Sequence, residues 1–172
     1  MMFFEIMLCV FTLFLVTMLS GCERTEQKDK VVDVIAKDNG KNIQNTKKTA
    51  YLTFDDGPSC LTEKYLDILE SEGVKATFFV IGQQINGEEQ TIKREISQGH
   101  EIGVHTYCHE ADRIYCNCDT YYKDVIKVKN ILKKQFGYDA GLVRFPWGSA
   151  NTYISSYRDN IIQRFKNIGL EY

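Results

Sequence analysis

The stretch TFDDGP, residues 53–58, places two adjacent carboxylates at the end of an apolar run and follows them with a Gly-Pro break. Residues 50–54 predict a strand, and burying two neighbouring like charges inside a sheet would cost several kcal/mol. We therefore expect this strand to present Asp55 and Asp56 to a metal ion or a basic partner. Because Asp and Gly-Pro are also ordinary turn residues, these residues alone leave a solvated turn as the alternative.

On the carboxyl side of this stretch, short β-branched and aromatic runs alternate with segments of helical periodicity. The predicted strands are residues 50–54, 76–81, 101–105 and 142–145, and the predicted helices are residues 62–72, 88–98, 119–136 and 155–168. The run ATFFVI at 76–81 lacks polar alternation, which suits a central strand covered on both faces. The whole pattern is typical of βα units around a mainly parallel sheet, so the expected fold class is α/β.

Two of the predicted helices carry an apolar face that we expect to be buried. One side of the helix at 62–72 carries Tyr65, Ile68 and Leu69, together with Leu61 directly before the helix. In the helix at 119–136 the apolar side chains are Tyr121, Val125, Val128, Leu132 and Phe136, at spacings of 4, 3, 4 and 4. Spacings of three and four residues keep side chains on one side of a helix, so each set should pack against the sheet.

Polar side chains gather where the predicted strands hand over to loops, which is where parallel α/β sheets carry their functional groups. Asp55 and Asp56 follow the first strand, His105 and His109 end or follow the third, and Arg144 lies in the fourth. Two neutral imidazoles and a carboxylate can hold a divalent ion such as Zn²⁺ and leave positions open for water. His100 lies in the loop before the third strand and lacks this setting, so we expect it to be structural.

The N-terminal segment predicts export. Residues 6–19 form an apolar stretch of 14 residues, which as a helix rises only about 21 Å against about 30 Å of hydrocarbon. It is therefore typical of a signal peptide over residues 1–21. Small residues before Cys22 resemble the lipobox of bacterial lipoproteins, in which this cysteine is lipidated. Glu5 and the lack of Lys or Arg at the start leave a short uncleaved anchor as the alternative.

Composition adds three constraints. Residues 23–49 are polar, contain no aromatic residue and predict a linker without a core of its own. The chain of 172 residues is 44% hydrophobic, as expected for one globular domain with an appendage. Its net charge of -2 gives no sign of a nucleic-acid partner. Together these features predict a domain over residues 50–172 that is exported and anchored to the outer face of the bacterial cell membrane.

Three motifs, taken together, resemble those of a known family. They are TFDDGP at 53–58, GHEIGVHTYCH at 99–109 and RFPWG at 144–148, in this order. They are similar to the first three motifs of the polysaccharide deacetylases of the NodB-homology type, carbohydrate esterase family four. The resemblance implies a distorted, incomplete (β/α) barrel. It also implies removal of acetyl groups from N-acetylated sugars in chitin, peptidoglycan or related polymers.

The same resemblance implies a role for each matching residue. Asp55 would be the general base, and Arg144 would orient and charge-balance it. Asp56, His105 and His109 would bind the metal, Zn²⁺ being expected. Pro146 and Trp147 would lie at the substrate, with the backbone amide of Trp147 sharing the oxyanion with the metal. Family members usually have tyrosine or glycine at the position of Trp147, which leaves a backbone contact intact and can alter the groove.

Two further motifs of the family are absent from this sequence. They are an Asp-Trp segment that walls the acetyl pocket and a Leu-x-His whose histidine is the general acid. No histidine follows His109. We therefore expect a C-terminally truncated domain that lacks its last strands, binds metal weakly and has little deacetylase activity by itself. A separately encoded C-terminal half is the partner that this expectation implies.

Two other functions remain open at this point. A membrane-tethered remnant would bind glycans without turnover. A structural zinc site made by His105, His109, Cys116 and Cys118 would give a binding module with no open coordination position. Export would also permit a disulfide among Cys60, Cys108, Cys116 and Cys118, whose pairing the sequence does not determine.

Overall fold

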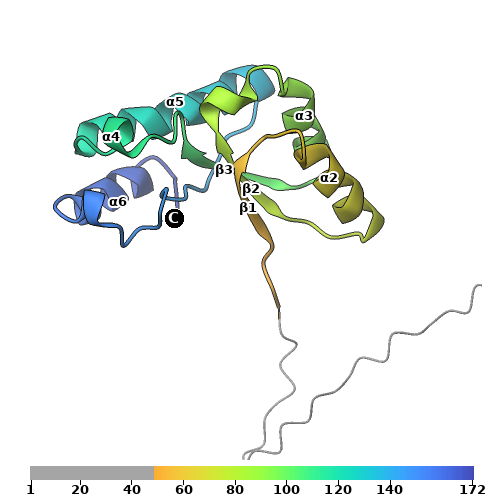
Figure 1. Cartoon of the computed structure of the whole chain (residues 1–172), viewed down its shortest axis with the longest axis horizontal. Coiled ribbons are helices and arrows are strands. Elements are labelled where there is room, and N and C mark those ends of the chain that lie inside the picture. The colour runs from red at the N-terminus through yellow and green to blue at the C-terminus, as the bar shows by residue number, and fades with distance from the viewer. Residues whose placement is uncertain (1–48) are drawn as a thin grey trace, which may run out of the picture. The chain divides into compact units, whose positions relative to one another are not determined.

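A computed structural model describes residues 49–172, which contain a parallel sheet flanked by helices (Figure 1). The predicted signal peptide, Cys22 and all but the last residue of the predicted linker lie outside the described residues. Within residues 49–172, none of the helices combines the length and the apolar character needed to cross a bilayer.

The sheet has three strands in the order β1-β2-β3, and both pairs are parallel. The elements are β1 Thr53–Gly57, α2 Thr62–Ser71, β2 Thr77–Ile81, η1 Gly82–Ile85, α3 Glu89–Ser97, β3 Glu101–Thr106, α4 Ala111–Ile114, α5 Cys118–Phe136, η2 Thr152–Ile154 and α6 Arg158–Lys166. Beyond β3, the predicted strand at 142–145 is reduced to two parallel bridges, Val104 with Val143 and Leu142 with Glu171. The expected α/β class with a parallel sheet is confirmed.

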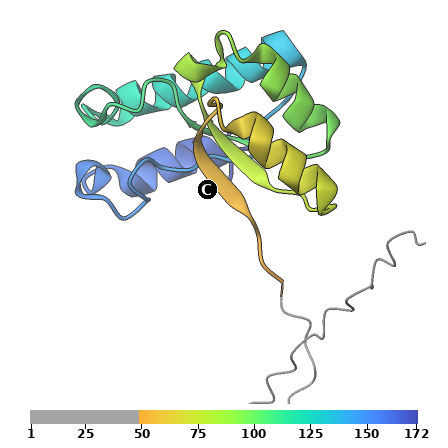
Figure 2. The ribbon, with the colours of Figure 1, turned by 45° about the vertical axis from the view of Figure 1, so that its right-hand side comes forward.

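Helices cover both sides of the sheet. In Figures 1 and 2, α2 and α3 lie to one side of the strands, and α6 and most of α5 lie to the other. Both α3 and α5 pack against β3, while α2 lies beside α3 and α6 beside α5. The central strand β2 is buried from Phe78 to Ile81, as its unbroken apolar run predicts.

The long helix α5 has the buried face that its sequence predicts. Tyr121, Val125, Val128 and Leu132 are fully buried, whereas Phe136, the last residue of the helix, is partly buried. Gly137 follows the helix with a φ of 68°. Glycine adopts this left-handed conformation without steric cost, which is why it so often follows a helix.

The structure corrects the predicted face of α2. Leu66 and Leu69 are buried, whereas Ile68 is 58% exposed and Tyr65 lies at the edge, stacked on Phe54 with ring centroids 5.2 Å apart. Leu66 and Leu69 belong to the main hydrophobic core together with Phe78 and Val80 of β2, so packing on the core buries this side of the helix. The last helix is also shorter than predicted, because the short helix η2 and a turn precede α6.

Candidate active site

The end of β1 separates the two adjacent carboxylates. The sequence predicted that Asp55 and Asp56 follow the first strand. In the structure they are instead the third and fourth residues of β1. The pairing of β1 with β2 shifts register between Asp55 and Gly57, and Asp56 has a φ of 66°. Such irregularities change the direction in which a strand side chain points. The two acids consequently have different partners.

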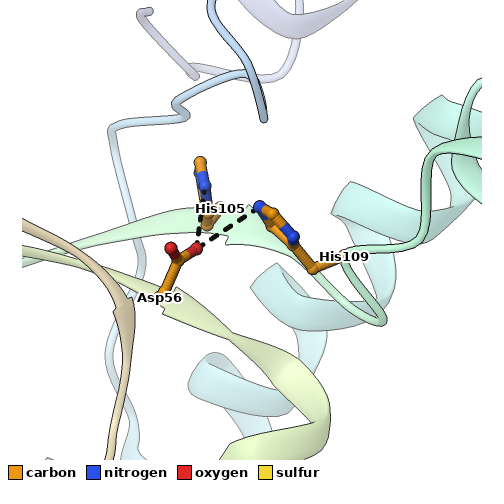
Figure 3. Close-up of side chains that lie close together, drawn as sticks. All are labelled: Asp56, His105 and His109. Atoms are coloured by element: carbon orange, nitrogen blue, oxygen red, sulfur yellow. Dashed lines mark ion pairs between the residues drawn. The ribbon is translucent and has the colours of Figure 1, made fainter.

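Asp56 meets the two histidines that end and follow β3. Its Oδ1 lies 3.3 Å from Nε2 of His105 and 3.3 Å from Nε2 of His109 (Figure 3). The three potential ligand atoms lie within 4.8 Å of one another. One carboxylate oxygen and two imidazole nitrogens at this spacing can surround a divalent ion and leave coordination positions open. The predicted group Asp56, His105 and His109 is therefore brought together.

A hydrogen bond at Nδ1 of His105 leaves Nε2 of the same ring available to a metal ion. Its Nδ1 lies 2.8 Å from the backbone oxygen of Arg144. Because a carbonyl oxygen only accepts, Nδ1 carries the proton in this bond, and Nε2 keeps its lone pair for the ion. Burial lowers the pKa of His105, and the neighbouring His109 adds to this effect. The neutral imidazole is the form that binds a metal, so the donor set fits the expected ion.

Asp55 pairs with Arg144 on the other side of the strand end. Nη1 of Arg144 donates to Oδ1 of Asp55 at 2.8 Å and to Oγ1 of Thr53 at 2.9 Å. The guanidinium also lies over the ring of Phe79, 4.1 Å from its centroid. A Cβ at Gly103 would come within 2.4 Å of that ring, so only glycine lets it lie here. The carboxylate of Asp55 is thus held beside the metal group and outside it.

Three residues of the site have an unfavourable backbone conformation. Asp56, His109 and Trp147 have φ values of 66°, 53° and 59°. Positive φ is uncommon outside glycine and is a clear outlier for a bulky residue such as tryptophan. Strain of about 1–3 kcal/mol per residue persists only where the surroundings enforce it, and such residues cluster at functional sites. Among residues 49–172, these are the three non-glycine residues with positive φ, and all of them line one pocket.

The loop that carries Trp147 is held from beneath. Oη of Tyr115 donates to the oxygen of Pro146 at 2.9 Å. Nδ2 of Asn151 donates to the same oxygen at 3.2 Å and to the oxygen of Gly148 at 2.6 Å. Pro146, which the resemblance places at the substrate, is buried and does not line the pocket, and its contact with substrate stays a prediction. The carbonyl of Pro146 is occupied in fixing the turn, whereas Trp147, Gly148 and Ser149 of the same loop line the pocket.

Two further residues support the site and are not apparent in the sequence. Oδ1 of Asp124, in α5, accepts from Oγ1 of Thr106 at 2.5 Å and from the backbone N–H of Tyr107 at 2.7 Å. The amide of Gln84, with its nitrogen turned toward them, donates to the oxygens of Asp56 and Pro58 at 2.8 and 2.7 Å. Both are polar residues in helices, and the sequence does not distinguish them from ordinary surface residues. Only their tertiary contacts show that they support the site.

We predict that Asp124 orients the loop between the two histidines. Asp124→Ala should weaken Zn²⁺ binding about 10- to 100-fold, the usual cost of losing a group that positions metal ligands. Asp124→Asn should recover much of the affinity because it keeps an acceptor oxygen. The measurement is titration calorimetry with Zn²⁺, with folding checked by circular dichroism.

The matched control for this prediction is Asp139→Ala. Asp139 pairs with Lys129 and Lys133 of the same helix, at 2.6 and 3.3 Å, and touches no site residue in the described part of the chain. Asp124→Ala and Asp139→Ala binding Zn²⁺ equally well would contradict a positioning role for Asp124.

One pocket unites nearly all the predicted site residues. Asp55, Asp56, His105, His109, Arg144 and Trp147 line it together with Phe79, Leu142, Val143 and Phe145. His100 is outside it and is structural, as expected, since its Nδ1 accepts from the backbone N–H of Ala76 at 3.2 Å. A charged, ligand-bearing floor with apolar walls suits a small polar group attached to a larger molecule.

The alternative of a structural zinc site receives no support from the described residues. Cys116 and Cys118 are not part of the metal-binding group. The thiol of Cys116 donates to the oxygen of Asp112 at 2.7 Å, and that of Cys118 to Oδ1 of Asn160 at 3.2 Å. The four cysteines that the structure describes, Cys60, Cys108, Cys116 and Cys118, are free thiols.

A parallel α/β sheet that presents an open Asp-His-His group beside an arginine-paired carboxylate is typical of metal-assisted hydrolases. Comparison with known proteins defines the group further. The sequence profile of the polysaccharide deacetylases matches residues 42–172, so the chain belongs to this family.

Individual relatives agree with this assignment. The chain is 33% identical over 125 residues to a peptidoglycan-N-acetylglucosamine deacetylase of Bacillus cereus, which covers 73% of the chain and 44% of that protein. It is 33% identical over 132 residues to the peptidoglycan-N-acetylmuramic acid deacetylase PdaC of Bacillus subtilis, covering 76% of the chain and 28% of the relative. The chain thus spans less than half the length of both relatives.

A solved structure confirms the fold. The catalytic domain of a peptidoglycan N-acetylglucosamine deacetylase from Eubacterium rectale superposes with a TM-score of 0.66 at 36% identity. The superposition covers 71% of this chain and 57% of that one. The chain therefore has the α/β architecture of NodB-type deacetylases and covers part of the domain.

Proposed function

We propose that this protein is a Zn²⁺-dependent hydrolase that removes N-acetyl groups from a cell-wall polysaccharide, most simply peptidoglycan. The observation that carries the proposal is the division of the two adjacent carboxylates. Asp56 faces His105 and His109 at 3.3 Å, while Asp55 is held 2.8 Å from Arg144. Metal-assisted amide hydrolysis requires a set of metal ligands and a carboxylate that does not bind the metal, and the two acids divide these roles.

Asp56, His105 and His109 would hold the ion. When bound, it supplies a Lewis acid that lowers the pKa of coordinated water to about 7 and polarises the acetyl carbonyl. Asp55 accepts the proton of the attacking water, and Arg144 keeps its carboxylate oriented. The N–H of Trp147 takes no part in the hydrogen bonds that hold its loop within the described chain, so it can donate to the developing oxyanion.

The choice of peptidoglycan rests on location as well as on relatives. The apolar segment before Cys22 supports export and attachment to the outer face of the membrane, where peptidoglycan is the adjacent N-acetylated polymer. The relatives named above are described as acting on peptidoglycan. Chitin oligomers carry the same N-acetylglucosamine group and serve as soluble substrates.

Acetate release from peptidoglycan and from chitin oligomers tests the proposal. We expect release that needs Zn²⁺, stops on chelation and returns when the ion is added back. Oligomer binding with no Zn²⁺-dependent acetate would favour a glycan-binding remnant instead.

A further inference from the structure

An exposed aromatic surface continues outward from the candidate active site. Trp147 is 55% exposed and Tyr153 is 52% exposed, with ring centroids 6.1 Å apart. The ring of Trp147 lies 4.8 Å from that of His109, a metal-ligand candidate. Trp147 lines the pocket, whereas Tyr153, in η2, lies outside it. The pair therefore leads from the metal-binding group to the surface beyond the pocket.

Both rings are supported from below. Tyr153 stacks on Tyr115, with centroids 5.7 Å apart and planes inclined by 15°. Tyr115 is only 6% exposed, and its hydroxyl also holds the turn before Trp147. One face of Tyr153 is thus packed, and half of its surface still meets water. A ring fixed in this way loses little conformational entropy when a ligand covers its open side.

The stability of the fold does not explain why two neighbouring aromatic rings are exposed here. Large aromatic side chains stabilise a fold most when they are buried, and neighbouring exposed ones mark binding surfaces more often than structural ones. Trp147 in addition has a φ of 59°, a conformation that costs energy for a bulky residue. The chain therefore accepts strain at the residue that is held beside both His109 and Tyr153.

We propose that Trp147 and Tyr153 form a stacking platform for the sugar ring next to the one whose N-acetyl group enters the pocket. This inference rests on the proposed function and deepens it. Pyranose rings present an apolar C–H face that packs on aromatic rings, so the open faces of Tyr153 and Trp147 suit such a ring. Tyr153 then gives the site a preference for polymers over single sugars.

Binding measured without turnover tests the platform separately from the deacetylase activity. The full chain is titrated, without metal, with N-acetylglucosamine and with the chitin tetramer by NMR or calorimetry. We expect the tetramer to bind more tightly than the monosaccharide. Tyr153→Ala should raise the Kd of the tetramer about tenfold, as for an aromatic anchor of a binding surface, and leave that of the monosaccharide unchanged.

Three variants make the result specific to the π face. Tyr153→Phe should bind the tetramer like the wild type. Tyr153→Leu keeps an apolar contact with Tyr115, so it tests the ring itself even if Tyr153→Ala folds poorly. Tyr51→Ala is the matched control, because Tyr51 is 90% exposed and precedes the opposite end of β1.

Unchanged tetramer affinity in folded Tyr153→Ala or Tyr153→Leu would overturn the platform. So would equal affinity of the wild type for monosaccharide and tetramer, or a loss in Tyr51→Ala as large as that in Tyr153→Ala. Length-dependent binding with no acetate release would count against the proposed function and leave the platform standing.

Discussion

Asp55→Asn is expected to lower kcat/KM for acetate release by about 10²-fold or more, while the affinity for Zn²⁺ stays unchanged. Asparagine has the shape of aspartate and can still accept the hydrogen bond from Arg144, which lies 2.8 Å from Oδ1 in the wild type. It cannot accept the proton of the attacking water. Acetate release and Zn²⁺ calorimetry on the same preparation measure the two effects.

Asp56→Ala is the matched comparison, since it changes the next residue. Its carboxylate lies 3.3 Å from Nε2 of both histidines, so its removal should abolish measurable Zn²⁺ binding and activity together. If Asp55→Asn lost the metal, or if Asp56→Ala kept it, the division of roles between the two carboxylates would be wrong. Retained metal in Asp56→Ala would revive a structural His-Cys site.

Glu95→Gln is expected to stabilise the protein strongly at alkaline pH. Glu95, in α3, is fully buried, and neither of its carboxylate oxygens has a hydrogen-bond partner in the described chain. Burial raises its pKa from the ordinary 4.5 to about 8, and the negative charge of Glu63 adds to the rise. The folded state therefore binds this proton more tightly than the unfolded state does.

The consequence for stability follows from proton linkage. The contribution of protonated Glu95 is fully present below about pH 4.5 and is lost as the pH rises through about 8. The gap between the two pKa values corresponds to about 5 kcal/mol, a large part of a typical folding free energy. Glu95→Gln should match the wild type at pH 4.5 and exceed it by about this amount at pH 9. Urea unfolding at both pH values gives the difference, in which all other titrating groups cancel.

Asp119→Asn is the control for this prediction. Arg164 donates to Asp119 at 2.6 Å and lowers its pKa, so the stability it contributes is present at neutral pH and is lost only as the pH falls below its ordinary 3.8. Its difference from the wild type should not vary between pH 5 and 9. A pH-independent difference for Glu95→Gln over the same range would show that Glu95 does not titrate as its burial implies.

Local sequence was sufficient for most of the elements. The run at 76–81 suited a strand covered on both sides, which the structure shows, and α5 had an apolar repeat long enough to indicate its buried face. In α2 two stripes of similar hydrophobicity compete within ten residues, so periodicity could not choose between them. The segment at 142–145, predicted as a strand, forms only single bridges, Val143 with Val104 and Leu142 with Glu171, and the sequence alone did not indicate this reduced pairing.

For the site, residue chemistry and order identified what the ends of parallel strands bring together. Asp55, Asp56, His105, His109 and Arg144 all reach one pocket because parallel strands end at the same edge of a sheet. Each of these residues lies in a short sequence motif that can be recognised locally. The alternation of strands and helices then predicts the parallel sheet that brings the motifs together. For these residues the sequence by itself was therefore enough.

Tertiary structure alone decided how those groups are aimed. The register shift at the end of β1 directs Asp56 to the histidines and leaves Asp55 to Arg144. Asp124 supports the histidine loop from a helix 17 residues away, and Tyr115 supports the turn of Trp147 from a distance of 31 residues. Such contacts cannot be predicted from hydrophobic periodicity, because a polar residue on a helix gives the same sequence pattern whether its side chain faces water or binds a loop. The sequence thus determined which groups form the site, and packing determined the direction in which each one points.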